Sequence, residues 1–178
     1  MTMDFSDFHR FLAARNSVRE YQNTPLSEEE IQYILSCACT APSAGNREAW
    51  DVLVVTDQEL KWALAQAAFD QAHVEQAPVL FVVCANYIRS MSKYGERGIL
   101  YAVQDATIAA TYMMLAAHAT GFGCCWTGAF EESEVKGILD LPQHIRPLAI
   151  LAVGKETEAP LGKTERIPLE EHVHHEYW

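Results

Sequence analysis

Residues 99–120 are the segment that most restricts how this chain can fold. They are rich in alanine, methionine and leucine and have few polar breaks, which predicts one long helix that is apolar almost all round. Gly121 is a natural end for it. A helix of this kind belongs at the centre of a domain or at an interface between chains, so the other elements have to be arranged around it.

Shorter helices are predicted elsewhere from apolar residues at helical spacing and from capping signals. Ser27 and Glu30 form a capping box, and Pro42 stops the helix that follows it. Asp57 is placed to cap another helix. The predicted helices cover residues 4–14, 28–41, 58–69 and 132–139.

Three apolar runs rich in β-branched residues predict buried strands, and a glycine-rich segment predicts a short one. The runs are residues 50–56, 79–86 and 147–153, and the glycine-rich segment is 121–130. The last two dozen residues carry charges and two prolines without a clear period, which predicts an extended tail. The strands are few and alternate irregularly with the helices. We therefore predict an α+β fold, with a mixed, mostly antiparallel sheet flanked by helices.

Chain length and composition limit the organisation and the partners. At 178 residues with 49% hydrophobic content, we expect one domain over residues 1–178. The formal net charge is -11, which argues against binding nucleic acid or an anionic membrane surface. No apolar run is expected to approach the roughly 20 residues that span a bilayer, and the first residues do not resemble a secretion signal. We expect a cytoplasmic protein.

The five cysteines predict free, buried thiols rather than a disulfide framework, because their number is odd and most lie within apolar runs. Their spacings do not match a tetrahedral zinc site, so no metal is expected. They are Cys37, Cys39, Cys84, Cys124 and Cys125.

The stretch RNSVRE places two arginines and a serine at alternate positions in an acidic chain. If this stretch is extended, Arg15, Ser17 and Arg19 fall on one side, where two guanidinium groups and a hydroxyl face a common anion. The alternative is a solvated basic turn. Lys163 and Arg166, in the tail segment GKTERIP, offer a second cationic pair, for which a solvated charge cluster is again the alternative.

Two small-residue turns lie between these cationic stretches. APSAGNREAW and GFGCCWTGAF would let backbone amides approach a flat ligand, although glycine turns often do no more than reverse a chain. The usual phosphate-binding loops, G-x-G-x-x-G after a strand and G-x-x-x-x-G-K-[ST], are absent.

In their order and flanking residues, these segments resemble the nitroreductase family of FMN-dependent oxidoreductases, from Arg15 to about Val173. The resemblance implies that Arg15, Ser17 and Arg19 match an R-x-S-x-R/K element that holds the FMN phosphate and ribityl chain. It places Arg19 near flavin N1 and the C2 carbonyl. The loop that matches P-S-x-x-N, lying along the flavin mostly through backbone atoms, consists of Pro42, Ser43, Ala44 and Asn46.

The same resemblance implies further cofactor contacts. Gln71 corresponds to a polar side chain offered to the pyrimidine edge of the flavin, and Lys163 and Arg166 correspond to a K-x-R pair at the phosphate. Their spacing here is K-x-x-R, a departure that weakens the match of Lys163. Three further positions, 48, 49 and 129, carry Glu, Ala and Ala where relatives frequently have Gln, Pro and Gly. The turn that borders the isoalloxazine consists of Trp126, Thr127 and Gly128.

The resemblance implies a homodimer with two flavins at the subunit interface. The expected activity is reduction of a nitroaromatic, quinone or similar small-molecule acceptor by NADH or NADPH through FMN, in a ping-pong order. No catalytic side chain is expected, because the cofactor carries the chemistry. Two alternatives stay open: a flavin reductase or other narrow-substrate member, and a non-catalytic FMN-binding redox protein.

The segment YIRSMSKYGERG, residues 87–98, is polar and contains two glycines, which predicts a long loop between the second strand and the long helix. Loops of this length in small domains often carry function, and we interpret it as a cover over the flavin. Tyr94 and Arg97 are then candidates to stack on or orient a planar acceptor. The alternative is a solvated connector.

Overall fold

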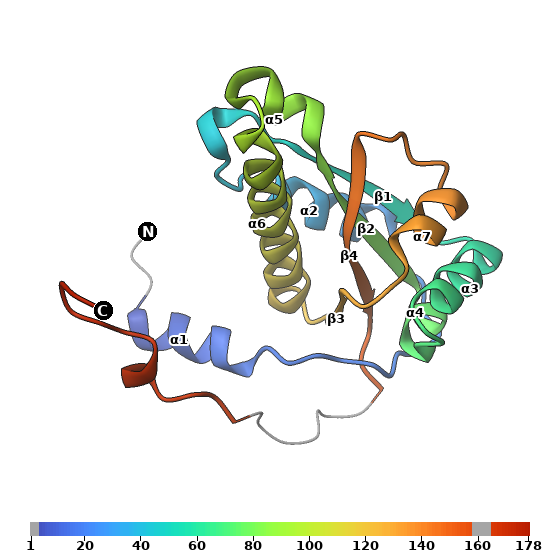
Figure 1. Cartoon of the computed structure of the whole chain (residues 1–178). Coiled ribbons are helices and arrows are strands. Elements are labelled where there is room, and N and C mark those ends of the chain that lie inside the picture. Colours follow the sequence, from blue (N-terminus) through green and yellow to red (C-terminus); the bar gives the residue numbers. More distant parts are fainter. Residues whose placement is uncertain (1–3, 158–164) are drawn as a thin grey trace.

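A computed structural model describes residues 4–157 and 165–178. Its centre is a four-stranded antiparallel sheet with helices on both faces (Figure 1). The strand order is β1-β2-β4-β3, so β1 and β3 form the two edges. The strands are β1 (Trp50–Val55), β2 (Val79–Asn86), β3 (Gly123–Thr127) and β4 (Ile145–Gly154).

Strand β2 shows how the sheet divides two apolar cores. Successive side chains of a strand point to opposite faces. Phe81 and Val83 pack with α2 (Glu28–Ala38) and α6 (Arg97–Ala119), whereas Leu80 and Val82 pack on the opposite face. That second face is covered by α3 (Gln58–Ala67), α4 (Ala72–Gln76) and α7 (Glu132–Ile138). Because both faces are covered, β2 is a continuous apolar run rather than an alternating one.

Helix α6 is the long helix expected over residues 99–120, and it begins two residues earlier than predicted. By length and composition it could cross a membrane, which corrects the expectation that no apolar segment reaches that size. Its packing makes it a core helix, since a row of alanines and Met113 is buried between α2 and the sheet. The other side of α6 exposes Leu100 and Tyr112.

The capping predictions are confirmed. Ser27 and Glu30 exchange hydrogen bonds at the start of α2, and the Asp57 carboxylate accepts from the amide of Leu60 at 2.9 Å at the start of α3. Helix α1 (Phe5–Ala14) is also present, and Asp4 caps it. None of its residues is buried, and its apolar side chains include Phe5, which is 88% exposed.

Three elements differ from the sequence predictions. The four named strands pair only antiparallel, so the sheet is not mixed; the parallel contact is an isolated bridge between Ser17 and Cys124. Residues 87–98 are not a loop, because α5 (Tyr87–Tyr94) is helical and the chain then turns directly into α6. Helix α4 was also not predicted. In the described part of the tail, residues 165–178, the one regular element is the short helix Leu169–Glu171.

Candidate functional site

The RNSVRE stretch lies along the outer edge of β3. The amide of Val18 donates to the carbonyl of Cys124 at 3.2 Å, and Ser17 bridges Cys124 in parallel. Gly123 permits this approach, because a Cβ there would lie within 2.7 Å of the Val18 side chain. The stretch is therefore extended, as a common side for its polar residues requires.

This backbone conformation separates apolar from polar side chains. Val18 is buried, whereas Ser17 and Arg19 are exposed and Arg15 is partly exposed. Burial raises the pKa of the Cys125 thiol, and the positive charges of Arg19 and Arg15 act against this rise. Both guanidinium groups therefore lie close enough to β3 to act on the same side chain. Two cations and a hydroxyl line one edge of the sheet, an arrangement suited to a phosphate.

The end of β3 joins this edge to α4. Thr127 is buried, and its hydroxyl lies 2.7 Å from Nε2 of His73. The side-chain nitrogen Nε2 of Gln71 donates to the carbonyls of Ala68 and Ala129 at 2.8 and 3.1 Å. Gln71 thus has its nitrogen occupied, whereas its side-chain oxygen is still available to accept a hydrogen bond beside the Trp126–Gly128 turn.

His73 gives this corner a pH dependence. It is 6% exposed, and burial, followed by the charge of Arg19, lowers its pKa below the ordinary 6.5. At pH values between the folded pKa of His73 and 6.5, the imidazole is therefore protonated in the unfolded chain and neutral in the folded one. We expect the free energy of unfolding to fall as pH is lowered through 6.5 toward the folded pKa, and this contribution to be constant above 6.5.

The measurement is thermal unfolding at about pH 7.5 and about pH 5.5. The drop between the two conditions should be smaller in His73→Gln than in the wild type, since glutamine does not titrate. His9→Gln, which removes an exposed histidine from α1, is the control. An unchanged drop in His73→Gln would contradict the prediction.

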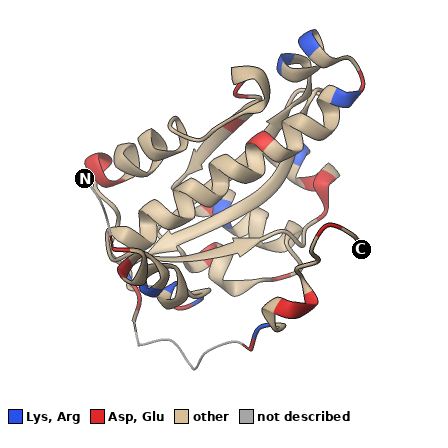
Figure 2. Ribbon diagram, turned by 90° about the vertical axis from the view of Figure 1, so that its left-hand side faces the viewer, with Lys and Arg blue, Asp and Glu red and all other residues tan. Residues whose placement is uncertain are grey.

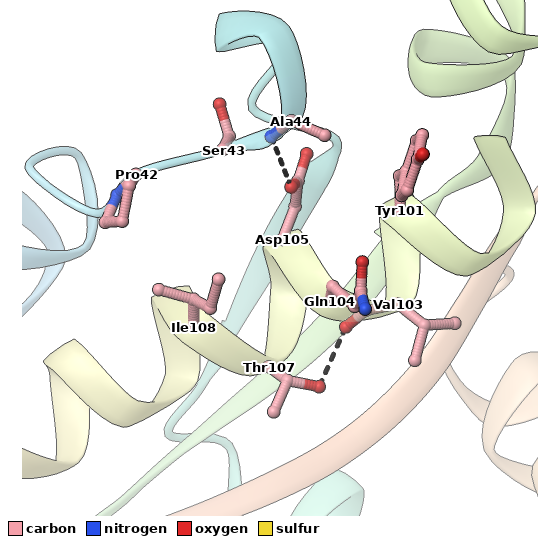
Figure 3. Close-up of a pocket in the computed structure, with 9 residues that line it drawn as sticks. All are labelled: Pro42, Ser43, Ala44, Tyr101, Val103, Gln104, Asp105, Thr107 and Ile108. Atoms are coloured by element: carbon pink, nitrogen blue, oxygen red, sulfur yellow. Dashed lines mark hydrogen bonds between the residues drawn. The ribbon is translucent and has the colours of Figure 1, made fainter. Parts of the chain in front are cut away.

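The small-residue turn before β1 adopts a conformation that needs support. Gly45, Asn46 and Glu48 have positive φ angles of 55°, 55° and 46°. Asp105 on α6 supplies that support: one carboxylate oxygen accepts from the amide of Ala44 at 2.8 Å (Figure 3), and the other accepts from the amide of Ala49 at 3.1 Å. Asp105 is 2% exposed, so one buried carboxylate holds both ends of the turn.

Beside this turn is a cavity of about 540 Å³ between it and the exposed side of α6. Figure 3 shows Pro42, Ser43 and Ala44 above the helix, and Tyr101 and Ile108 along it. Most of the lining is apolar, which is typical of sites for planar organic ligands.

One chain does not bring the two predicted cofactor-binding regions together. The turn at residues 42–46 contacts Asp105, whereas the chain leading into RNSVRE contacts His118, whose Nε2 lies 3.1 Å from the carbonyl of Phe11. Asp105 and His118 are thirteen positions apart on α6, or about 20 Å along the axis at 1.5 Å per residue. Figure 1 shows the two regions at opposite ends of α6.

The cofactor contacts predicted for Lys163 and Arg166 in the tail stay a prediction. Arg166 is exposed, and no hydrogen bond or ion pair joins it to the β3 edge within the described residues. Lys163 lies outside the described residues.

Helix α5 is joined by hydrogen bonds and an ion pair to the chain between the turn at residues 42–46 and β1. Arg89 pairs with Asp51 and donates to the carbonyls of Glu48 and Trp50, while Arg47 donates to the carbonyl of Arg89 at 3.2 Å. Tyr94 lies against Gly45, where a side chain would have no room. The predicted cover residue Tyr94 therefore lies beside the turn, although on a helix rather than a loop.

The cysteines near the β3 edge do not supply a nucleophile. Burial raises the pKa of Cys124 to about 12, and it raises the pKa of Cys125 as well. Both thiols are protonated at neutral pH, and a protonated thiol is a poor nucleophile.

Comparison with known proteins identifies the family to which this fold belongs. The family model described as "Nitroreductase family" matches residues 12–78 and 65–155, which include the β3 edge, the turn and α6. The chain belongs to the nitroreductase family. It is an oxidoreductase of the NAD(P)H nitroreductase and FMN reductase type.

Three relatives show how far this nitroreductase family likeness extends. An NADH dehydrogenase of Thermus thermophilus is 32% identical over 88% of this chain and 89% of its own. An FMN reductase (NADPH) of Bacillus subtilis is 31% identical over 90% of this chain and 69% of its own. The structure of NfrA1 of B. megaterium superimposes with a TM-score of 0.91 at 32% identity, covering 97% of this chain and 75% of that one.

Three residues at the site of this nitroreductase fold were not predicted from the sequence. Asp105 had a signal, because it is the one carboxylate within the apolar helix. Tyr101 had none beyond its place in the same helix. His73 lies two residues after Gln71, but only the pairing of α4 with the end of β3 brings it to Thr127.

Proposed function

We propose that this protein is an FMN-dependent oxidoreductase that uses NADH or NADPH to reduce a small acceptor such as a nitroaromatic or a quinone. The observation that carries the proposal is the β3 edge. Arg15, Ser17 and Arg19 alternate there along an extended stretch that runs beside β3, the strand that leads into the turn Trp126–Gly128. The name of the B. subtilis relative, an FMN reductase that uses NADPH, supports the choice of cofactor and reductant.

The residues present fit FMN. A phosphomonoester carries up to two negative charges, and the guanidinium group of Arg15 and the hydroxyl of Ser17 can donate to several of its oxygens. These local contacts outweigh the repulsion from a chain of net charge -11, because screening weakens distant charges and leaves close contacts largely intact. Gly128 is exposed, so the adjoining turn is open to a flat ring.

The chain's own residues then bind and orient the cofactor. Arg15 and Ser17 hold the phosphate end, and Arg19 places a positive charge near the ring. Gln71 offers its side-chain oxygen to a ring N–H, since its nitrogen is occupied by Ala68 and Ala129. Bound FMN supplies the transfer of electrons from NAD(P)H to the acceptor. The two substrates occupy one place in turn, which gives a ping-pong order.

The working unit in this proposal is a homodimer. The β3 edge and the turn at Pro42–Asn46 lie at opposite ends of α6, so a second copy is needed to place one copy's turn against the other's edge. Two apolar surfaces support this arrangement: the exposed face of α1, with Phe5 and Phe8, and the exposed side of α6. Contiguous apolar surface of this kind marks interaction sites. The five free cysteines are consistent with work in the reducing cytoplasm.

The test is reconstitution followed by anaerobic reduction. We expect protein loaded with FMN to be yellow, to release FMN rather than FAD on denaturation, and to lose its absorbance at about 450 nm when NADH or NADPH is added. Loaded protein should sediment as two chains. Protein that binds no FMN would remove the proposal. Loaded protein that neither dinucleotide reduces would be a flavin carrier instead.

A further inference from the structure

Positive charge gathers at one end of this acidic protein. Figure 2 shows several Lys and Arg segments at the end formed by α5 and the start of α6, with an acidic segment, Glu96, between Lys93 and Arg97 in the chain. The residues there are Arg47, Arg89, Lys93 and Arg97, four of the thirteen Lys and Arg residues in a chain with twenty-four carboxylates. A cluster of this sign against the overall charge calls for an explanation.

Two of these cations are used within the fold. The guanidinium group of Arg89 lies 2.8 Å from the Asp51 carboxylate and donates to two backbone carbonyls. Arg47 donates to the carbonyl of Arg89 and to the hydroxyl of Ser92. Both therefore fasten α5 to the turn before β1, and their hydrogen-bonding capacity is largely spent.

Lys93 and Arg97 differ from this pair. Within the described residues, neither forms an ion pair with a carboxylate. The Lys93 ammonium lies 3.4 Å from the carbonyl of Gly45, and Nε of Arg97 donates to the hydroxyl of Tyr101 at 2.8 Å. Both side chains are exposed, and each keeps further donors for a ligand.

Two tyrosines place these cations at the rim of the cavity. Tyr94 and Tyr101 pack edge to face with ring centres 4.9 Å apart, and the Arg97 guanidinium lies 5.4 Å from the Tyr101 ring centre. Tyr101 lines the cavity beside Pro42–Ala44 (Figure 3). Lys93 and Arg97 do not line the cavity themselves, but Arg97 contacts the lining residue Tyr101, and Lys93 contacts Gly45, the neighbour of the lining residue Ala44.

The geometry between the two cations is held by backbone packing. A Cβ at Gly98 would lie within 2.8 Å of backbone atoms of Ser90 and Met91, so α5 packs directly on the first turn of α6. Lys93 and Arg97, which lie on either side of this contact, are carried by two elements that cannot shift independently.

We propose that Lys93 and Arg97 bind an anionic substituent, a carboxylate or phosphate, on the electron acceptor that enters this cavity. The inference rests on the proposed function and deepens it, because it names the chemical class of acceptor. The same chemistry is present in the phosphates of the nicotinamide dinucleotide, and the experiment separates the two sources.

The experiment compares 4-nitrobenzoate with 4-nitrobenzamide, which share a ring and a nitro group and differ by one charge. The variant is Lys93→Gln with Arg97→Gln. At saturating NADH, we expect kcat/KM for 4-nitrobenzoate to fall roughly tenfold, mostly through KM, because exposed charge contacts are modest. The value for 4-nitrobenzamide should change less than about twofold. Arg10→Gln with Lys136→Gln removes the same two charges from α1 and α7 and should leave both values unchanged.

Calorimetry of 4-nitrobenzoate binding to the oxidised protein gives a second readout that needs no turnover. The double variant should bind it roughly tenfold more weakly than the wild type does, with an unchanged melting temperature. Binding of this kind in a protein that NAD(P)H does not reduce would support this inference and overturn the proposed function.

Two results would overturn the inference. Equal losses of kcat/KM for 4-nitrobenzoate and 4-nitrobenzamide would show that the two cations do not recognise the negative charge of the acceptor. A loss in the reductive half-reaction, with NADH, NADPH or both, that accounts for the loss in turnover would assign Lys93 and Arg97 to the phosphates of the dinucleotide instead of the acceptor.

Discussion

Replacing Asp105 by alanine destabilises the protein by roughly 2 to 6 kcal/mol and weakens FMN binding with it. The carboxylate accepts from the amides of Ala44 and Ala49, and each buried donor left without a partner costs about 1 to 3 kcal/mol. The turn between these amides contains Gly45, Asn46 and Glu48 at positive φ, so it also loses the contact that holds its conformation. Chemical denaturation of the apoprotein measures the first effect and flavin titration the second.

Asp105→Asn should destabilise the protein less than Asp105→Ala does. The amide retains one acceptor oxygen and presents an NH₂ group to the other backbone donor, so its cost should lie between that of the wild type and that of Asp105→Ala. Thr107→Ala is the control for stability, because Thr107 is on the same helix but its hydroxyl donates, among the described residues, only to the carbonyl of Val103. If Asp105→Ala leaves the unfolding midpoint where it was, the carboxylate is not what holds the turn.

The parts of this fold that could be predicted from sequence are those that local chemistry determines. The Ser27–Glu30 capping box, the Asp57 cap and the apolar run of β2 each depend on residues close together in the chain. The extended RNSVRE stretch belongs here too, since alternation of polar residues with Val18 is a local pattern. In each case one physical interaction decides the conformation.

Helix α5 was missed although a local signal existed. The glycines and polar residues of the segment 87–98 resemble a loop, but Tyr87, Met91 and Tyr94 recur at helical spacing and Asn86 caps the first turn. The glycines have other roles: Gly95 ends the helix at a positive φ of 56°, and Gly98 allows backbone contact with α6. For this segment, the helical spacing of its apolar residues predicts the structure better than its glycine and polar content does.

The arrangement of the candidate site could not be predicted in this way. Whether strands pair parallel or antiparallel depends on how β1 to β4 meet across the chain, which no local pattern records. The distance between the β3 edge and the turn at Pro42–Asn46 likewise depends on which end of α6 each contacts. Both regions could be predicted from sequence motifs, whereas only the three-dimensional packing shows that they lie far apart within one chain.

Arg15→Ala weakens FMN binding by on the order of 1.5 to 3 kcal/mol, the range for a hydrogen bond to a charged group. That corresponds to a rise in Kd of about 10-fold to 150-fold. The fold should be retained, because the Arg15 side chain is partly exposed and the stretch is held to β3 through the backbone of Val18. Fluorescence titration with FMN measures the affinity, and circular dichroism checks the fold.

Two comparisons decide whether the loss comes from the phosphate contact. Arg10→Ala removes the same charge from α1, where Arg10 pairs with Asp7, and should leave Kd within about twofold of the wild type. Titration with riboflavin, which lacks the phosphate, should show little difference between Arg15→Ala and the wild type, since the lost contact is to the phosphate. An unchanged FMN affinity in Arg15→Ala with native circular dichroism would reduce the RNSVRE stretch to a basic turn. An equal loss for riboflavin and FMN would place Arg15 against the ring or the ribityl chain instead.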